Sequence, residues 1–396
     1  MTKMMSEGAG RLRLLIILYL AFISLGLPDT VLGVAWPEMR LTFDAPLVWA
    51  GGLQSLTTIL SVCSSLAAGW LMRKFPAGRI VAVSALMTAL AMFGYSLAPG
   101  LAVVVGFTVL FGLGQGAVDS SVNAYMSRHY SSRQMNWVHG CWGLGAVGGP
   151  LIFTAVYGLG LPWRAGYLTL GLVQSSLALV FFLTLKWWQI NGNVSTPDNG
   201  SMPGGPAALF SPSRAAAGVA FYFFYPGVEV VTGLWGASYL MAVMGAPASL
   251  AGAALAGYWA SLTLGRFAMG LAAARLSNRT IMRGGLTLAA VSLIALVLAP
   301  GPGFFSAALA LLGLGLAPMY PTMMHETPRR TGPERSDQII SFQVGAAQAG
   351  AAVLPVLAGL IVRQAGLGVL PHLLMVMVMI LIAAHELSAR GGTRAD

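Results

Sequence analysis

The sequence predicts an all-α membrane protein in which twelve spanning helices form two pseudo-symmetric six-helix bundles. Of the 396 residues, 57% are hydrophobic and only 9% are charged, and the mean hydropathy is +0.76. A soluble domain carries roughly 25% charged residues. Apolar runs of about 20 residues, the length that crosses a bilayer core, recur from one end of the chain to the other. A polar break near the middle separates six runs from six more.

The expected spans follow these runs, and their order sets the domain organisation. The break at residues 191–212 is rich in Gly, Pro, Ser and Asn, which is typical of a linker. We therefore expect an N-terminal bundle at 1–190, a cytoplasmic linker at 191–212 and a C-terminal bundle at 213–396. The expected spans are 13–36, 47–71, 79–98, 101–126, 137–160, 164–186, 214–242, 248–274, 281–299, 303–325, 338–361 and 366–386.

The net charge of +10 reflects topology rather than a nucleic-acid partner, because the basic residues lie in short connectors between apolar runs. With the N-terminus inside, eighteen Lys and Arg residues fall on the cytoplasmic side and three on the outer side. The positive-inside rule then places both termini and the linker in the cytoplasm. We expect a monomeric multi-pass protein of the lipid bilayer, in a bacterial inner or cytoplasmic membrane.

Several other classes of protein are disfavoured. No set of His, Cys and carboxylate residues has metal-ligand spacing, and no nucleophile–base pair is apparent, so we expect neither a metal, a cofactor nor an enzyme. Cys63 and Cys141 lie in apolar runs and are interpreted as packed thiols. A sensor would need an appended soluble domain, and the longest connector is the central linker.

Short motifs recur in the same order in the two halves, which predicts an internal repeat. A Ser-Leu-Thr sequence, a Gly-Leu-Gly sequence and a proline with an acid close after it each have a counterpart at a similar offset in the other half. The pairs are Ser55-Leu-Thr57 with Ser261-Leu-Thr263, Gly112-Leu-Gly114 with Gly313-Leu-Gly315, and Pro28-Asp29 with Pro226 and Glu229.

Two six-helix halves are the architecture of the major facilitator superfamily. The sequence Gly69-Trp-Leu-Met-Arg73-Lys74-Phe-Pro-Ala-Gly78-Arg79 resembles that superfamily's loop between its second and third helices. The family usually has an acidic residue where Arg73 stands, so its usual ion-pair latch is altered here. The resemblance implies that Arg73 and Arg79 belong to a gate.

A closer resemblance lies in three other segments. Gly114-x-Gly116-x-x-Asp119-x-x-x-Asn123 resembles the helix-four signature of the fucose:proton symporter family, which has Glu at the Asp position. The other two segments resemble that family and the related sodium-dependent glucose transporter-like group. They are Asn136-x-x-His139 followed by Gly143-x-Gly145-x-x-Gly148-Gly-Pro150, and Tyr225-Pro-Gly-x-Glu229 with Trp235.

Asp29, Asp119 and Glu229 are the carboxylates clearly inside expected spans, and we predict that they couple transport to protons. A charge at that depth is costly and usually functional. Burial favours the neutral form of a carboxyl group, which makes proton uptake and release possible. The alternative is a protonated or paired acid that only fixes packing.

Arg266 is the one cation well inside an expected span, and it needs an acid or carbonyl partner that the sequence does not identify. We interpret it as a brace on the gate, with a substrate ligand as the alternative. His139 could relay protons or bond a neighbouring carbonyl.

Amides that bridge hydroxyls and aromatic faces that stack on a ring are the groups that usually hold sugars. Aromatic residues also form belts at membrane interfaces, which is the alternative for each of them. The predicted substrate ligands are Asn123, Gln115, His139, Trp142, Asn136, Tyr225, Trp235 and Gln343, from a wider polar set that includes Gln174, Tyr258 and Gln348.

The sequence therefore predicts a proton-coupled symporter of a small sugar or polyol that works by alternating access. Na⁺ is an alternative coupling ion, because carboxylates also bind it. A proton-driven exporter of amphipathic drugs, lipids or metabolites on the same fold is the alternative function.

Overall fold

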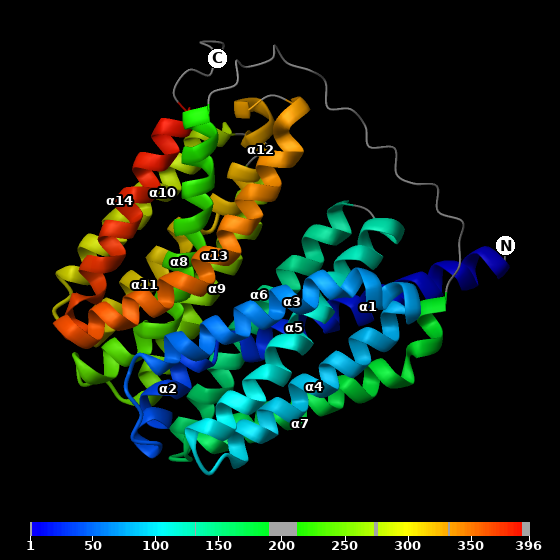
Figure 1. The fold of residues 1–396 in the computed structure, drawn as a ribbon, viewed down its shortest axis with the longest axis horizontal. Coiled ribbons are helices and arrows are strands. Elements are labelled where there is room, and N and C mark those ends of the chain that lie inside the picture. The colour runs from blue at the N-terminus through cyan, green and yellow to red at the C-terminus, as the bar shows by residue number, and fades with distance from the viewer. Residues whose placement is uncertain (1, 131, 190–211, 273–275, 332, 390–396) are drawn as a thin grey trace. The chain divides into compact units, whose positions relative to one another are not determined.

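The computed structural model describes residues 2–130, 132–189, 212–272, 276–331 and 333–389. These ranges contain fourteen α-helices and two short 3₁₀ helices (Figure 1). The predicted linker, residues 191–212, lies outside the described residues except for Pro212.

The chain divides into two compact units. Unit 1 comprises Met1–Ala45 and Leu56–Asp198, and unit 2 comprises Pro46–Ser55 and Asn199–Asp396. The helices that begin in the N-terminal half are α1 (Thr2–Asp29), α2 (Leu32–Thr42), α3 (Trp49–Lys74), α4 (Ala77–Leu97), α5 (Leu101–His129), α6 (Ser132–Gly158), α7 (Trp163–Leu183) and η1 (Leu185–Gln189). Those of the C-terminal half are α8 (Pro212–Ala242), α9 (Ala248–Ala272), α10 (Asn278–Val297), α11 (Pro302–Leu316), α12 (Met319–Thr331), α13 (Pro333–Ala365), η2 (Leu367–Val369) and α14 (Leu370–Ala389).

Each of the twelve expected spans corresponds to one of these helices or to a broken pair of them. Eleven described segments are long and apolar enough to cross a membrane. The twelfth expected span corresponds to α9, which is 25 residues long but contains Gly, Ser, Thr and Tyr residues that lower its hydropathy. The prediction of an all-helical fold with twelve spans is confirmed.

Two expected spans are broken where the sequence predicted continuous helices. The segment 13–36 is divided between α1, which ends at Asp29, and α2, which begins at Leu32. Pro28 cannot donate a backbone hydrogen bond, and the Thr30 hydroxyl donates to the carbonyl of Ala146 at 2.8 Å within the break. The segment 303–325 is likewise divided between α11 and α12, just before and after Pro318. Proline explains both breaks.

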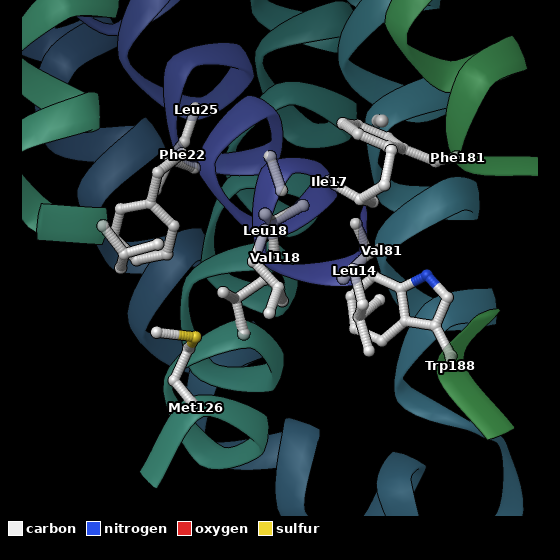
Figure 2. Close-up of a cluster of buried hydrophobic side chains, with 14 of the residues drawn as sticks. Leu14, Ile17, Leu18, Phe22, Leu25, Val81, Val118, Met126, Phe181 and Trp188 are labelled. Atoms are coloured by element: carbon white, nitrogen blue, oxygen red, sulfur yellow. The ribbon is translucent and has the colours of Figure 1, made fainter. Parts of the chain in front are cut away.

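Helix α1 runs through the core of unit 1 (Figure 2). Its residues Leu14, Leu18 and Phe22 are spaced one turn apart and are almost fully buried. They belong to one apolar cluster with Val81 of α4, Val118 and Met126 of α5, Phe181 of α7 and Trp188 of η1. This packing holds α1 in place, and therefore also the acid at its end.

The recurring Gly-Leu-Gly sequences lie at matching positions in the two units. In α5, a Cβ atom on Gly112 would lie 2.8 Å from the Thr57 carbonyl of α3, and one on Gly114 would lie 2.8 Å from the Ser84 carbonyl of α4. In α11, Gly313 meets the Tyr258 carbonyl of α9, and Gly315 meets backbone atoms of α10. Both glycine pairs thus allow one helix to approach two neighbours closely, as small residues do in membrane proteins.

In unit 2, α8 is the buried central helix and packs against α9, α13 and α14. Phe221, Tyr225 and Trp235 are almost fully buried on it. The N-terminal end of α3 also belongs to this unit, because the Ser55 hydroxyl donates to the carbonyl of Ala352 in α13.

One prediction about the cysteines is wrong. Both are free, but Cys63 on α3 is exposed rather than packed, and only Cys141 is partly buried. An apolar residue of a membrane helix needs no protein neighbour, since lipid is as apolar as another side chain.

Candidate functional site

Unit 1 contains a polar stripe on α5 made of Gln115, Asp119 and Asn123, which are spaced one helical turn apart. The Gln115 amide donates a hydrogen bond of 2.7 Å to Asp29 at the end of α1. The Asn123 amide donates one of 3.0 Å to Asp119. Each carboxylate therefore has an amide donor, and all four side chains are only partly buried. We call these four residues the acid–amide cluster.

The two carboxylates of the acid–amide cluster interact electrostatically with each other. Like charges repel each other strongly where water is scarce, so a proton or a cation bound to either carboxylate is favoured. The amide oxygens of Gln115 and Asn123 can accept hydrogen bonds. The arrangement can bind a proton or a hard cation, and it can bond hydroxyl groups.

The glycines of α5 determine the direction of this stripe. Gly112 and Gly116 lie against α3, and Gly114 lies against α4, while Gln115 bonds to α1. Two serines of α3 hold the same contact, because Ser64 donates to the carbonyl of Leu113 at 2.5 Å and Ser65 to that of Gly116 at 3.1 Å. The α5 backbone is therefore fixed on the faces that do not carry the acid.

Unit 2 contains a second charged group, which joins α8 to α9. Nη2 of Arg266 lies 3.4 Å and 3.5 Å from the two carboxylate oxygens of Glu229 and 3.2 Å from the Tyr225 hydroxyl. The Tyr258 hydroxyl donates to the backbone carbonyl of Glu229 at 3.4 Å. We call Arg266, Glu229 and Tyr225 the ion-pair cluster.

The sequence left the partner of Arg266 open, and the structure identifies Glu229. A signal was present, because Glu229 is the one acid well inside an expected span of the C-terminal half, whereas Glu386 stands at the last position of its span. The two residues also lie in consecutive spans, whose helices α8 and α9 pack together. Tyr258 was only in the wider polar set of the sequence analysis, yet it contacts this cluster.

The remaining predicted residues lie elsewhere in the two units. His139 on α6 is exposed, with its ring edge-on to Phe22 at 5.1 Å. Trp142 is partly buried, and its backbone carbonyl lies against Gly26 of α1. The side chain of Asn136 is outside the described part of the chain. Arg73 and Arg79 are exposed at the facing ends of α3 and α4.

Two further predicted ligands are buried within unit 2. Trp235 of α8 is fully buried, and Gln343 of α13 is 2% exposed. The Gln343 side-chain oxygen accepts a hydrogen bond of 3.0 Å from Thr327 of α12. Neither of the two clusters above includes these residues.

The sequence matches a family model described as "Major Facilitator Superfamily" over residues 18–224 and 215–389. These two matches cover most of the chain. The chain belongs to the major facilitator superfamily. Members of this superfamily are membrane transporters built from two six-helix halves, so the protein is a multi-pass transporter and not an enzyme.

Solved structures of major facilitator proteins share this fold at low sequence identity. A bacterial homologue of the human lysosomal transporter Spinster, inward-facing and occupied, has a TM-score of 0.74 at 16% identity, with 96% of each chain covered. The nucleoside transporter NupG has a TM-score of 0.74 at 13% identity, with 94% of this chain and 98% of that one covered. The peptide transporter POT has a TM-score of 0.70 at 15% identity, with 95% of each covered. A comparison with curated protein sequences gave no match.

Within this major facilitator fold, the described residues contain no group of three or more His, Cys, Asp or Glu that could hold a metal ion. One polar residue of the wider set is part of the helix packing. Gln174 on α7 is fully buried, donates to the Ser24 carbonyl at 2.5 Å and accepts from the Ser24 hydroxyl at 2.5 Å. It holds α7 against α1 and has no surface left for a ligand.

Proposed function

We propose that this transporter is a proton-coupled symporter that imports a small sugar or polyol. The observation that carries the proposal is the acid–amide cluster of unit 1, in which two interacting carboxylates each receive an amide hydrogen bond. Asp119 binds the coupling proton, Asp29 assists it, and Asn123 and Gln115 contact substrate hydroxyls.

The chemistry of the cluster supports this assignment. Protonation of one carboxylate relieves its repulsion with the other. The cluster with one bound proton is therefore favoured in free energy over the cluster with two negative charges. A carboxylate in a membrane span is otherwise costly, which argues that it serves the transport cycle. An amide beside each acid offers both a donor and an acceptor to a hydroxyl.

The sequence resemblance points to the same substrate class. The stripe on α5 resembles the signature of the fucose:proton symporters, with Asp119 in place of their Glu. Among the proteins of similar fold, NupG is a nucleoside transporter and POT a peptide transporter, so this fold carries small polar solutes.

Uptake by purified protein in liposomes tests the proposal. We expect labelled sugars to accumulate when the outside is acidic, and a sodium gradient alone to give no accumulation. The Asp119→Asn variant should lose accumulation but keep exchange of substrate across the membrane in the absence of a gradient. Asp119→Asn liposomes that still accumulate sugar against its gradient would rule out the coupling role.

The matched control is Asp44→Asn. Asp44 is an exposed acid between α2 and α3 with a positive φ of 47°, a conformation that Asn also adopts readily. It should transport like the unmodified protein. Movement of lipophilic cations instead of sugars, in the direction opposite to that of the protons, would favour a proton-driven exporter.

We further propose that the protein lies in a bacterial inner membrane with both termini in the cytoplasm, on the distribution of Lys and Arg. Reporter fusions at the two ends test this: a cytoplasmic reporter should be active at both.

A further inference from the structure

Arg266 is poorly satisfied by the residues around it. All its side-chain contacts described above are made by Nη2, at 3.2 Å to Tyr225 and at 3.4 Å and 3.5 Å to Glu229. Charge-assisted hydrogen bonds are normally 2.7–2.9 Å long. Nε of Arg266 is buried and has no hydrogen-bond partner among the described residues. The guanidinium therefore makes only long contacts to its acid, and the part of it that a ligand could reach is its exposed end.

A second arginine in the same unit shows what a well-formed brace looks like. Arg283 of α10 bonds Glu386 of α14 through Nε at 2.9 Å and Nη2 at 2.7 Å, one bond to each carboxylate oxygen. This is the two-pronged geometry that arginine and a carboxylate prefer. Glu229 does not give Arg266 that geometry. A charge inside a span has lost its hydration, so it depends more on a well-placed partner than an exposed charge does.

Arg266 is more exposed than Glu229 in the ion-pair cluster. The Arg266 side chain is 33% exposed, whereas that of Glu229 is 11% exposed. Tyr225 and Tyr258 are almost fully buried, so Arg266 is the most exposed of these four side chains. An incoming ligand would therefore meet a positive charge first.

The geometry points to a carboxylate ligand: we propose that Arg266 binds a carboxylate on the transported substrate. The substrate class is then a hydroxylated organic acid, such as a sugar acid, rather than a neutral sugar. A planar guanidinium matches a carboxylate in shape and charge. A phosphate dianion fits less well, because Glu229 already supplies one negative charge beside Arg266. The inference rests on the proposed function, since it names the substrate of the same transporter.

Binding measurements on the full chain in detergent test this inference with matched probes. Glucose, gluconate and glucuronate have six carbons each, and the last two carry a carboxylate; glycerate and lactate are smaller acids, and glucose 6-phosphate replaces the carboxylate with phosphate. We expect at least one of the carboxylates to raise the melting temperature in a saturable manner, and glucose and glucose 6-phosphate to bind at least tenfold more weakly.

The variants locate the carboxylate. Arg266→Lys keeps the charge but loses the planar donor set, so its affinity for the bound carboxylate should fall about tenfold or more. The double variant Arg266→Gln, Glu229→Gln removes both charges together, which avoids an unpaired acid, and should abolish the difference between acid and neutral probe. Arg283→Gln is the control and should bind as the unmodified chain does.

Several results would overturn the inference. They are equal binding of glucose and its acids, no binding of any carboxylate, and carboxylate binding that survives in both Arg266 variants.

Liposome uptake distinguishes failure of the carboxylate inference from failure of the proposed symport. Proton-driven accumulation of a neutral sugar would leave the symport standing and remove the carboxylate. Carboxylate binding at Arg266 without any proton dependence of uptake would support the carboxylate ligand and rule out proton-coupled symport.

Discussion

Gln115 of α5 donates a hydrogen bond of 2.7 Å to Asp29, the last residue of α1. The bond joins two residues 86 positions apart and brings the acid beside the broken end of α1 into contact with the polar stripe of α5. Asp119 lies one turn further along that stripe, and its charge interacts with that of Asp29. The two acids of unit 1 therefore belong to one cluster, although the sequence presents them in different spans.

Replacing Gln115 with Leu should weaken transport without unfolding the protein. The substitution removes the amide donor to Asp29, and a hydrogen bond to a charged group contributes about 1.5–3 kcal/mol. We therefore expect kcat/KM for proton-driven uptake to fall by about 10- to 100-fold, measured in liposomes.

The control for this variant is Gln364→Leu, which makes the same chemical change at an exposed position near the end of α13. It should transport normally. If both variants retain full uptake, Gln115 does not support the acid, and the acid–amide cluster loses one of its members.

Breaking the ion-pair cluster one residue at a time should destabilise the protein more than removing both charges. Arg266→Gln leaves Glu229 without its cation, and a buried unpaired charge costs about 3–5 kcal/mol. Because a third of the Arg266 side chain is exposed, we expect a smaller cost, about 2 kcal/mol. Thermal unfolding of the purified single and double variants measures this, and the double variant should recover part of the loss. A double variant less stable than both single ones would contradict a direct pairing.

Adding a methyl group at Gly116 should damage the packing that carries the acid. A Cβ atom there would collide with the backbone of Ser61 in α3, which cannot move as a side-chain end can. Overpacking of this kind costs about 1–3 kcal/mol. Gly106→Ala lies in the same helix and has nothing within 4 Å of the added atom, so it serves as the control. Thermal unfolding should show a lower melting temperature for Gly116→Ala but not for Gly106→Ala. Equal melting temperatures of the two variants would mean that α3 shifts to accommodate the added methyl group.

The fold and its repeat were predictable because they depend on regular features of the chain. Apolar run lengths gave the spans, and the family resemblance agreed with the matched superfamily. The two Gly-Leu-Gly sequences were predicted as equivalent, and Gly112 and Gly313 indeed pack against corresponding neighbouring helices, α3 and α9. Patterns of this kind are local, so they can be recognised without knowing which helices touch.

The contacts of the candidate site were less predictable, because they join distant positions. Asp29 and Gln115 were each singled out by residue type, but nothing in the sequence paired them. Arg266 was expected to need a partner, and only the packing of α8 on α9 identifies Glu229. The break after α1 was also missed, since residues 13–36 were expected to form one continuous helix.

Gln174 shows the same limit for a ligand candidate, and it yields the last prediction. It was grouped with possible sugar ligands because it is an amide in a membrane span. Its two bonds to Ser24 of α1, both 2.5 Å long, use its oxygen and its nitrogen inside a fully buried contact. Gln174→Leu leaves the Ser24 hydroxyl and carbonyl without these partners, at a cost of about 1–3 kcal/mol. We expect a lower melting temperature with an unchanged KM for uptake by the protein that remains folded.

Asn123→Leu, on the polar stripe, should do the opposite and raise KM with little change in melting temperature. A rise in KM for Gln174→Leu would mean that α7 contributes to the substrate site.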